Sequence, residues 1–386
     1  MYDAVIIGAG ITGSYIADEL ARMGHSVCVL EKSPQAGAKA SCTGIISREC
    51  FNLLSPGRDL VQFEAHSAKI FSPSGKYLRV QREDIQAYVL DRPALDRNIA
   101  SRAEKHGVQY LFSTSVSGIE KKRQSLQVQA AHGGGATVLD ARLVIAACGF
   151  GTSLPRSLGL GQIHDYAQGA QALVDCPGLA EVEVYSDAEI APGFFSWLVP
   201  AGANRVKAGL LCHGNPRPFM DKYLSGLVQK GRINVAPAEI SYGAVPLSIL
   251  PRTYSDRIMV VGDAAGQVKP TTGGGIYFGL LCAGLCVQAA REALLSDDLS
   301  SRKLSQYQKQ WHKLLKQELA IDYWAHRFYR RLTNRQIEHV FNVIESHGIH
   351  ETILSSPDIS FDWHGRVIFD AMKHRSLQKS LRKLGR

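Results

Sequence analysis

The sequence predicts an α/β fold: a Rossmann-like domain, a second domain built on an antiparallel sheet, and a helical C-terminal region. Three observations lead to this prediction. The chain opens with a strand, a glycine turn and a helix within residues 2–23. Apolar runs at 143–149 and 257–263 have the composition of parallel strands that are buried on both faces. Residues 166–250 instead alternate apolar and polar side chains with frequent Gly and Pro, which is typical of antiparallel strands.

The opening segment has the pattern of a βαβ unit. YDAVIIG reads as a strand, and ITGSYIADELARM, which follows the turn, has apolar side chains at helical spacing. Gly24 is a suitable end for that helix, and HSVCVLEK at 25–32 reads as the second strand. Strand, helix and parallel strand in succession predict a right-handed crossover.

The later elements follow from the same patterns. In chain order we expect a loop at 33–47, a helix at 93–106, a strand at 108–116, a hairpin at 126–141 turning at Gly133–Gly135, buried strands at 143–149 and 257–263, and helices from about residue 300 onward. These elements form three expected domains: a cofactor-binding domain at 1–165 with 246–296, a substrate-binding antiparallel sheet at 166–245, and a basic helical region at 297–386.

The composition is that of a globular protein. The chain has 386 residues, of which 45% are hydrophobic and 20% charged, enough for two or three domains with cores of their own. Its longest apolar stretch, residues 276–287, is shorter than the ~20 residues of a transmembrane helix. A strand-like start predicts no signal peptide. Eight cysteines without a C-x-x-C pair argue against a zinc site or a disulfide framework, so we expect a reducing, cytoplasmic compartment and no metal.

The turn after the first strand reads GAGITG and contains the pattern G-x-G-x-x-G at Gly8, Gly10 and Gly13. The first glycine makes a tight turn, the second lets a pyrophosphate approach the backbone, and the third lets helix and strand pack closely. Glu31 ends the second strand, where a carboxylate accepts from a ribose hydroxyl and repels a 2′-phosphate. The site therefore favours FAD or NAD over NADP. Only one such fingerprint is present, so we expect one permanently held dinucleotide.

A second glycine-rich stretch, GDAAGQVKPTTGGGIYFG, occupies residues 262–279. The preceding strand delivers Asp263 to the sheet edge, where it is expected to bond a sugar or ribityl hydroxyl. The TTGGG turn then starts a helix whose bare N–H groups stabilise negative charge on a reduced flavin. The alternative is that Asp263 is an ordinary N-cap and the glycines a hinge. The cofactor contacts expected in this stretch are Gly262, Asp263, Pro270, Gly273, Gly274 and Gly275.

Three segments together resemble the FAD-dependent geranylgeranyl reductase family, whose broader fold is that of p-hydroxybenzoate hydroxylase. They are GAGITG with Glu31, VLDRPALDRNIASRAEKHG at 89–107, and VVGDAAGQVKPTTGGGI. The resemblance covers roughly the first 320 residues and implies FAD as the cofactor. Arg92, within the second segment, either pairs with the flavin phosphates or with a nearby acid.

A fourth segment of the resemblance concerns the substrate. Family members have a Y-x-W-x-F-P segment that lines the lipid cavity, and FSWLVP aligns with it: Trp197 and Pro200 match, whereas Phe195 and Val199 replace the tyrosine and phenylalanine. Independently of the family, a strand here places Phe195, Trp197 and Val199 on one face. Such an apolar wall suits a long hydrocarbon substrate, although an ordinary sandwich core gives the same pattern.

Two cysteines stand at positions that the resemblance makes informative. Family members place a cysteine before a glycine in a loop near the flavin, and Ser41-Cys42-Thr43-Gly44 resembles that loop. Cys42 is therefore the candidate catalytic residue, positioning the alkene or relaying a proton, with buried filler as the alternative. The third strand of the superfamily usually ends in Asp-Gly, but here it ends in Cys148-Gly149, so the resemblance does not carry over one cofactor contact or a docking role for free NADPH.

The function that the resemblance implies is FAD-dependent reduction of carbon–carbon double bonds in geranylgeranyl chains, on a lipid or a prenyl phosphate, by hydride transfer from reduced flavin. The electron donor, NAD(P)H or a ferredoxin-type protein, stays open. The alternatives are a monooxygenase or halogenase of the same fold, a quinone-linked electron-transfer flavoprotein, and a lipid-binding flavoprotein without turnover. The quinone-linked class has a cysteine cluster for iron–sulfur, whereas Cys282 and Cys286 are the only close pair here.

The C-terminal segment is strongly basic. Residues 366–386 contain seven Lys or Arg residues against the single acid Asp370, within a net charge of +9 for the chain. RSLQKSLRKLGR spaces three leucines as in a short amphipathic helix, which suits an anionic membrane surface or, equally, a solvated terminal helix. Aromatic residues do not interleave with these charges, so nucleic acid is not an expected partner. We expect a cytoplasmic protein, either free or peripheral on the inner membrane face.

Overall fold

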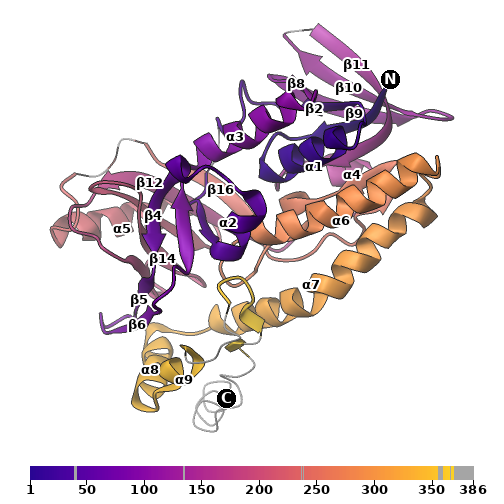
Figure 1. The fold of residues 1–386 in the computed structure, drawn as a ribbon. Coiled ribbons are helices and arrows are strands. Elements are labelled where there is room, and N and C mark those ends of the chain that lie inside the picture. The colour runs from indigo at the N-terminus through magenta and orange to yellow at the C-terminus, as the bar shows by residue number, and fades with distance from the viewer. Residues whose placement is uncertain are drawn as a thin grey trace. The chain divides into compact units, whose positions relative to one another are not determined.

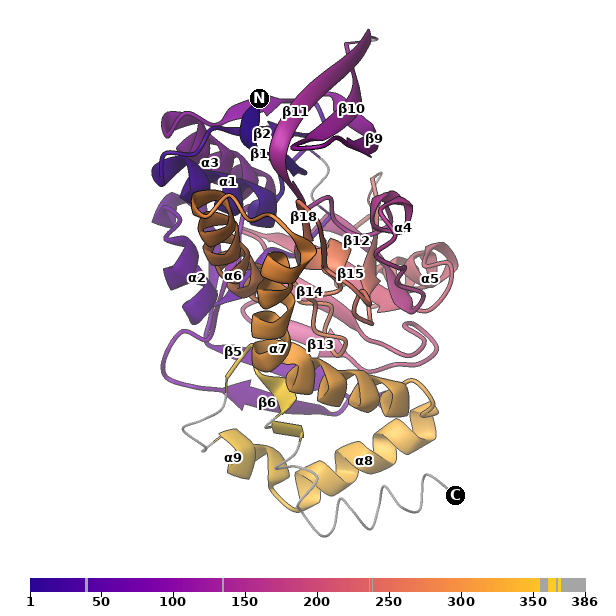
Figure 2. The same ribbon diagram turned by 90° about the vertical axis from the view of Figure 1, so that its right-hand side faces the viewer.

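The computed structural model describes residues 1–368 except 39, 40, 134, 236, 238, 355–359 and 366. The chain forms two compact units, each assembled from three separate segments. The first unit contains Met1–Ala40, Arg92–Tyr166 and Val245–Gln317, and the second contains Ser41–Asp91, Ala167–Ala244 and the chain from Glu318 onward. Figures 1 and 2 label many of the helices and strands of both units. The elements confirm the predicted mixture of α/β and antiparallel structure.

The first unit is built on an eight-stranded sheet in the order β17-β18-β11-β1-β2-β8, with β10 pairing β11 and β9 pairing β10. Its strands are β1 (Tyr2–Ile7), β2 (Val27–Leu30), β8 (Gln109–Leu111), β9 (Thr114–Lys121), β10 (Leu126–His132), β11 (Gly135–Ala146), β17 (Tyr254–Ser255) and β18 (Ile258–Val260). Its helices are α1 (Ile11–Arg22), α3 (Arg92–Lys105), α4 (Leu154–Ser157), the 3-10 turn η2 (Gly262–Ala265), α6 (Ile276–Leu295) and the first half of α7 (Ser301–Tyr329).

The βαβ unit forms as predicted: β1 pairs in parallel with β2, and also with β11 on its other side. The predicted strand at 108–116 is instead two strands, because Ser113 adopts a positive φ of 52° between β8 and β9. The predicted hairpin and the buried strand at 143–149 share one long strand, β11, which pairs antiparallel with β10 and parallel with β1. This strand delivers the start of the 147–152 turn to the carboxyl edge of the sheet.

α6 is a largely buried helix of the first unit. It packs against α1, and its buried side chains include Phe278, Leu280, Cys282 and Cys286. Among the described residues, α6 is the one helix long and apolar enough to cross a membrane, and 61% of its most apolar window is buried within the protein. That burial is typical of a core helix.

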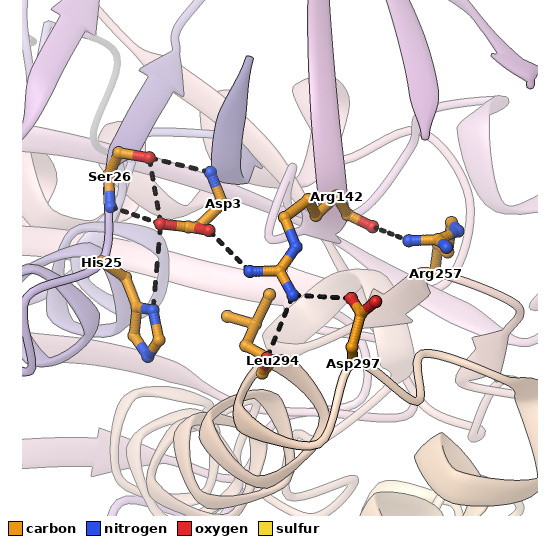
Figure 3. Close-up of polar contacts among 7 residues, drawn as sticks. All are labelled: Asp3, His25, Ser26, Arg142, Arg257, Leu294 and Asp297. Atoms are coloured by element: carbon orange, nitrogen blue, oxygen red, sulfur yellow. Dashed lines mark hydrogen bonds and ion pairs between the residues drawn. The ribbon is translucent and has the colours of Figure 1, made fainter. Parts of the chain in front are cut away.

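A polar network ties α6 to the sheet (Figure 3). Arg142 of β11 donates from Nη1 to Asp3 Oδ1 at 2.8 Å and from Nη2 to Asp297 Oδ1 at 2.7 Å. Nη2 also donates to the carbonyl of Leu294, in the last turn of α6, at 3.0 Å. Asp3 in turn accepts from the backbone N–H of Ser26 at 3.0 Å, so one guanidinium joins β1, β11 and the end of α6.

We expect Arg142→Met to destabilise the protein by about 1–2 kcal/mol, since charge-assisted hydrogen bonds are lost at a partly exposed site. Burial raises the pKa of Asp3, but hydrogen bonds from Ser26 and Arg142 outweigh it and hold that pKa below its usual value. The depressed pKa means that the contribution is present above the ordinary carboxyl pKa and disappears as the pH falls through the folded value. Thermal melts should therefore show a lower Tm for the variant at pH 7 and a smaller difference near pH 3.

The matched control is Arg22→Met, which removes a surface ion pair with Glu19 and should leave the free energy of unfolding within about 0.5 kcal/mol of wild type. An Arg142→Met deficit that is equally large at both pH values would contradict the role given to Asp3.

The second unit contains a seven-stranded sheet in the order β16-β12-β15-β14-β13-β5-β6 and a three-stranded sheet in the order β3-β7-β4. Its strands are β3 (Ile45–Ser47), β4 (Val61–Ala65), β5 (Ser67–Phe71), β6 (Tyr77–Gln81), β7 (Ala87–Leu90), β12 (Tyr166–Asp175), β13 (Val182–Tyr185), β14 (Ser196–Pro200), β15 (Arg205–Cys212) and β16 (Ser241–Pro246). Its helices are α2 (Arg48–Leu54), the 3-10 turn η1 (Arg58–Leu60), α5 (Arg217–Gln229), the second half of α7, α8 (Asn334–Ser346) and α9 (Ile349–Leu354).

The two faces of the seven-stranded sheet lie in different cores. On one face, Leu198 and Ala208 pack with Leu224 of α5. On the other face, Val199 packs with Val89 of the three-stranded sheet. Because neighbouring residues of a strand point to opposite faces, β14 contributes to both cores at once.

The compact units have different boundaries from the predicted domains. Residues 41–91 were expected with the cofactor domain, but β5 pairs in parallel with β13, and this pairing joins them to the second unit. Residues 301–317 of α7 likewise belong to the first unit rather than to a separate helical region. The C-terminal helices are present as predicted in α7, α8 and α9. The basic amphipathic segment expected at 375–386 lies outside the described residues.

Candidate functional site

The GAGITG turn joins β1 to α1 in the first unit. A Cβ at Gly13 would lie 2.0 Å from the carbonyl oxygen of Gly8, and a Cβ at Gly8 would lie 2.4 Å from that of Ala147. These two glycines therefore let α1, the turn and β11 approach closely. Gly10 differs: it is exposed, and a Cβ there would meet nothing within 4 Å. The turn thus presents open space at its second glycine, where a phosphate could approach the backbone.

The N-terminus of α1 faces the same open space. Gly10 is its N-cap, and this cap makes no side-chain hydrogen bond within the described structure. Uncapped N–H groups and the positive end of the helix dipole suit an anion. Glu31, at the end of β2, accepts from the N–H of Ala9 at 2.9 Å and of Ser33 at 2.8 Å. Its carboxylate is therefore fixed beside the turn, as its spacing predicted, with acceptor capacity remaining.

The second glycine stretch starts where β18 ends. Gly262 has a positive φ of 72°, and the loop that follows is closed by Gly273 N–H donating to the carbonyl of Lys269 at 2.8 Å. A Cβ at Gly275 would lie 2.7 Å from Asp263 Oδ1, so the aspartate lies directly behind the last glycine before α6. A Cβ at Gly274 would lie 2.8 Å from Lys269 Cε. At both positions a side chain would have to displace the end of a neighbouring side chain.

The alternative in which Asp263 caps the long helix is wrong. The N-cap of α6 is Gly275, and within the described structure no side chain makes a capping hydrogen bond there. The start of α6 is therefore glycine backbone with no capping side chain. Pro270 is buried inside the loop that precedes them.

Thr12 joins the two glycine motifs. A Cβ at Gly262 would lie 3.2 Å from Thr12 Oγ1, and one at Gly279 would lie 3.0 Å from the same atom. The beginnings of α1 and α6 thus lie against each other. Sequence reasoning missed Thr12, because a threonine in the first turn of a helix has no signal beyond an ordinary helix start.

Arg92 begins α3 and forms an ion pair with Asp96, one helical turn later, at 3.2 Å. The sequence left open whether Arg92 pairs with the flavin phosphates or with a nearby acid. The described contacts include the pair with the acid. Burial raises the pKa of Asp263, and the positive charge of Arg92 opposes that rise, so this guanidinium also acts on the second glycine stretch. Burial likewise raises the pKa of Asp96, against the effect of its partner.

Cys148 stands where the resembled superfamily has aspartate. Its Sγ lies 3.2 Å from Thr152 Oγ1, and burial raises the pKa of the thiol. The position therefore presents a neutral, weakly polar group in place of a carboxylate.

The predicted apolar wall lies in the second unit on β14. Trp197 and Val199 share a face, as expected from the strand period, and the ring of Phe195 lies 5.9 Å from that of Trp197 between centroids. Val199 is only 3% exposed and packs inside the core, as does Pro200, whereas Phe195 and Trp197 keep partial exposure. Within the described residues the indole N–H of Trp197 is buried without a hydrogen-bond partner. The two aromatic residues are thus the part of the wall that a ligand could touch.

Cys42 also lies in the second unit, in the turn before β3, and is partly exposed. Its Sγ accepts from the N–H of Gly44 at 3.4 Å. Sequence reasoning missed Lys207 of β15, whose Nζ donates to the carbonyl of Thr43 at 2.7 Å. The signal was available: Lys207 is a single charge in the apolar run VKAGLLC.

The structure therefore sorts the predicted site residues into two groups. All the predicted cofactor contacts lie in the first unit, and Cys42 lies with the Phe195–Pro200 wall in the second.

The chain is similar to curated proteins along most of its length. Digeranylgeranylglycerophospholipid reductase of Methanocaldococcus jannaschii is 31% identical over 323 residues, which cover 81% of this chain and 82% of that protein. The chain belongs to the geranylgeranyl reductase family. A second relative, digeranylgeranylglycerophospholipid reductase 2 of Methanothermobacter thermautotrophicus, is 30% identical over 82% of this chain and 85% of its own.

The family model of FAD-dependent oxidoreductases matches residues 3–79 of this geranylgeranyl reductase family member. The chain is accordingly an FAD-dependent oxidoreductase. Two features fit such a cofactor: the open space at the second glycine of the first turn, and the absence of a capping side chain at the start of α6.

Solved structures share the fold of this geranylgeranyl reductase family member. A geranylgeranyl bacteriochlorophyll reductase-like protein from Thermoplasma acidophilum superposes with a TM-score of 0.87 at 22% identity, covering 100% of this chain and 98% of that one. A flavin-dependent brominase superposes with a TM-score of 0.71 at 17% identity, covering 99% of each chain. The fold alone therefore allows both reduction and oxidative chemistry.

Proposed function

We propose that this protein reduces carbon–carbon double bonds in the geranylgeranyl chains of an isoprenoid lipid or prenyl phosphate. The observation on which the proposal rests is the similarity, over four fifths of the chain, to a protein named digeranylgeranylglycerophospholipid reductase. Two features of the chain support it: a glycine cradle suited to one dinucleotide, and an aromatic wall suited to a hydrocarbon.

In this proposal the first unit holds the dinucleotide. Gly8, Gly10 and Gly13 admit the pyrophosphate at the start of α1, and Glu31 accepts from the ribose. Asp263 accepts from a sugar or ribityl hydroxyl. The remaining proposed contacts are Arg92, Gly262, Pro270, Gly273, Gly274 and Gly275. FAD, when bound and reduced, supplies hydride to one alkene carbon.

The other groups of the chain then position and protect the reaction. The first N–H groups of α6, beyond Gly275, stabilise negative charge with the positive end of the helix dipole. Phe195 and Trp197 offer an apolar surface that excludes water from the prenyl chain. Cys42 borders that chain, where its thiol positions the alkene or relays the proton that the second carbon needs.

The decisive experiment is an anaerobic incubation of the purified holoprotein with dithionite and geranylgeranylated lipids, analysed by mass spectrometry. Each reduced double bond should add two hydrogens, roughly 2 Da, because hydride and proton are both retained. A matched incubation without reductant should leave the lipid unchanged. If the mass of several prenyl lipids stays unchanged with dithionite, the reductase proposal is wrong.

The rival chemistries have their own products. A monooxygenase or halogenase would add oxygen or halogen when NAD(P)H, oxygen and halide are supplied, and would leave the alkene unreduced under dithionite. Cys282 and Cys286 do not favour the quinone-linked alternative, because they are a pair on one buried helix, α6, whereas an iron–sulfur cluster of the usual kind is held by four cysteines.

We propose that the physiological electron donor is an external protein of the ferredoxin type or NAD(P)H. The absence of aspartate at position 148 removes one contact that the superfamily uses, and the chain has one nucleotide fingerprint, so a dedicated nicotinamide domain is not expected. Anaerobic bleaching of the bound flavin, first by NADPH and then by reduced ferredoxin, distinguishes the two donors.

We further propose that the protein is cytoplasmic and rests on the inner face of an anionic membrane. Trp324 and Phe328, one turn apart on α7, are 64% and 37% exposed, and the guanidinium of Arg327 lies 5.3 Å from the Trp324 ring centre. Exposed aromatic rings with basic neighbours suit the headgroup region of anionic lipid. Trp324→Ala should weaken sedimentation with vesicles containing phosphatidylglycerol by about threefold or more, with Tm unchanged.

Vesicles of phosphatidylcholine alone are the control, and both proteins should bind them weakly. Equal binding of wild type and Trp324→Ala to the anionic vesicles would contradict the docking role of α7.

A further inference from the structure

Lys207 occupies a place where a charge is costly. It is the third residue of β15, is 9% exposed, and has Leu173 of β12 and Val199 of β14 as its register partners. An ammonium removed from water in this way loses several kcal/mol of hydration unless polar groups replace it. Methionine would fill a similar volume without that cost. The charge therefore has a purpose other than packing.

The ammonium is directed at a turn of the chain. Lys207 Nζ donates to the carbonyl of Thr43 at 2.7 Å and to that of Leu90 at 3.2 Å. The N–H of Leu90 donates in turn to the carbonyl of Gly44 at 2.9 Å. Lys207 and the end of β7 thus hold the turn that contains Cys42, while the thiol itself keeps partial exposure.

The same lysine belongs to the face that bears the aromatic wall. Val206 and Ala208 of β15 point into the core under α5, so Lys207 between them points to the opposite face. That face contains Val199, directly opposite Lys207, and Trp197, directly opposite Gly209. One side chain therefore connects the Cys42 turn to the strand of the apolar wall.

We propose that Lys207 is a positioning residue, whose ammonium sets the place of Cys42 relative to the face of Trp197. This inference rests on the proposed function, in which Cys42 borders the prenyl chain. Lys207 acts through the backbone of the turn and does not itself touch the reacting alkene. Misplacing a reacting group by as little as 1 Å costs about a hundredfold in rate, so the effect should be large.

The test compares Lys207→Met with wild type in two measurements. The first is the rate at which iodoacetamide alkylates Cys42, read by peptide mass spectrometry, with Cys148 as the internal reference because it is also partly exposed. We expect a change of at least about fivefold at Cys42 and none at Cys148, because only the turn moves. The second is lipid reduction, where kcat should fall about ten- to a hundredfold with a smaller change in KM.

Two variants make the comparison specific. Lys207→Arg keeps the charge and can donate to both carbonyls, so it should restore a good part of both rates. Arg205→Met, two residues away on the same strand, removes an exposed cation whose distance to Asp175 is 4.0 Å, and should leave both rates at wild-type values.

A purely structural lysine would give a different result. If Lys207→Met lowers the Tm but leaves the Cys42 alkylation rate and kcat unchanged, the inference is overturned. If that variant does not fold, Lys207→Gln is measured in the same way, and unchanged rates overturn the inference equally. If the wild-type protein reduces no prenyl lipid, the proposed function fails, but the alkylation comparison still decides whether Lys207 positions Cys42.

Discussion

Gly13→Ala should unfold easily and lose its flavin, whereas Gly10→Ala should fold normally and yet bind FAD poorly. At Gly13 the new Cβ would lie 2.0 Å from the carbonyl oxygen of Gly8, which is backbone and cannot rotate away. Either α1 or the turn must move, and overpacking of this kind costs about 3 kcal/mol. Because we assign the phosphates to the N-terminus of α1, we expect binding to be lost along with stability.

Gly10 is the matched control for that change. Its backbone has a φ of −73° and a ψ of 177°, which alanine adopts without strain, and its Cβ would meet nothing within 4 Å. The apoprotein should therefore melt at the wild-type temperature. The added methyl group, however, enters the open space that we assign to the pyrophosphate, and the affinity for FAD should fall about tenfold or more, or about 1.4 kcal/mol.

Thermal melts of the two apoproteins, followed by flavin titration, check this contrast. A Gly10→Ala protein that binds FAD as tightly as wild type would show that the pyrophosphate does not approach there. A Gly13→Ala protein with normal Tm would show that α1 and the turn have more freedom than the structure indicates.

Gly209→Ala should disturb the aromatic wall of the second unit. A Cβ at Gly209 would lie 2.5 Å from Cζ2 of Trp197 and 2.9 Å from the carbonyl oxygen of Ala170. The backbone oxygen is held by strand pairing, so the indole has to move. We expect a loss of about 1–3 kcal/mol in the free energy of unfolding. We also expect a raised KM for the prenyl lipid, because the surface to which we assign the hydrocarbon changes shape.

Gly226→Ala is the control for glycine replacement in the same unit. Gly226 lies inside α5, where a Cβ would meet nothing within 4 Å, so alanine should stabilise the helix by up to about 1 kcal/mol without changing KM. The double variant Gly209→Ala/Trp197→Phe should recover stability relative to Gly209→Ala, since the smaller ring leaves room. Absence of any such recovery would show that Trp197 is not the group that Gly209 accommodates.

Local pattern was enough to predict the parts of the first unit to which we assign the nucleotide. The G-x-G-x-x-G turn, the helix after it and Glu31 at the end of β2 all follow from residues within one βαβ unit. The role proposed for these residues depends on backbone conformation and on their spacing along the chain, and the sequence indicates both. The uncapped start of α6 after three glycines was predicted for the same reason.

What only the tertiary structure decided concerns contacts between distant segments. Residues 41–91 join the second unit because β5 pairs with β13. The residues of neither strand indicate by themselves which strand the other will pair with. Asp263 lies behind Gly275 instead of capping α6, and Thr12 meets Gly262, because helix packing brings separate motifs together.

Lys207 shows both what the sequence determines and what only the tertiary structure decides. The sequence by itself determined that a lysine stands in an apolar strand, and that Cys42 lies in a glycine-containing turn. Only the folded chain shows that the ammonium reaches the carbonyl of Thr43, 164 residues away in sequence. The physical reason is that a buried charge is stabilised by the polar groups that lie within about 3 Å of it. The pairing of strands across the sheet determines which groups these are, and the residues next to Lys207 in sequence do not.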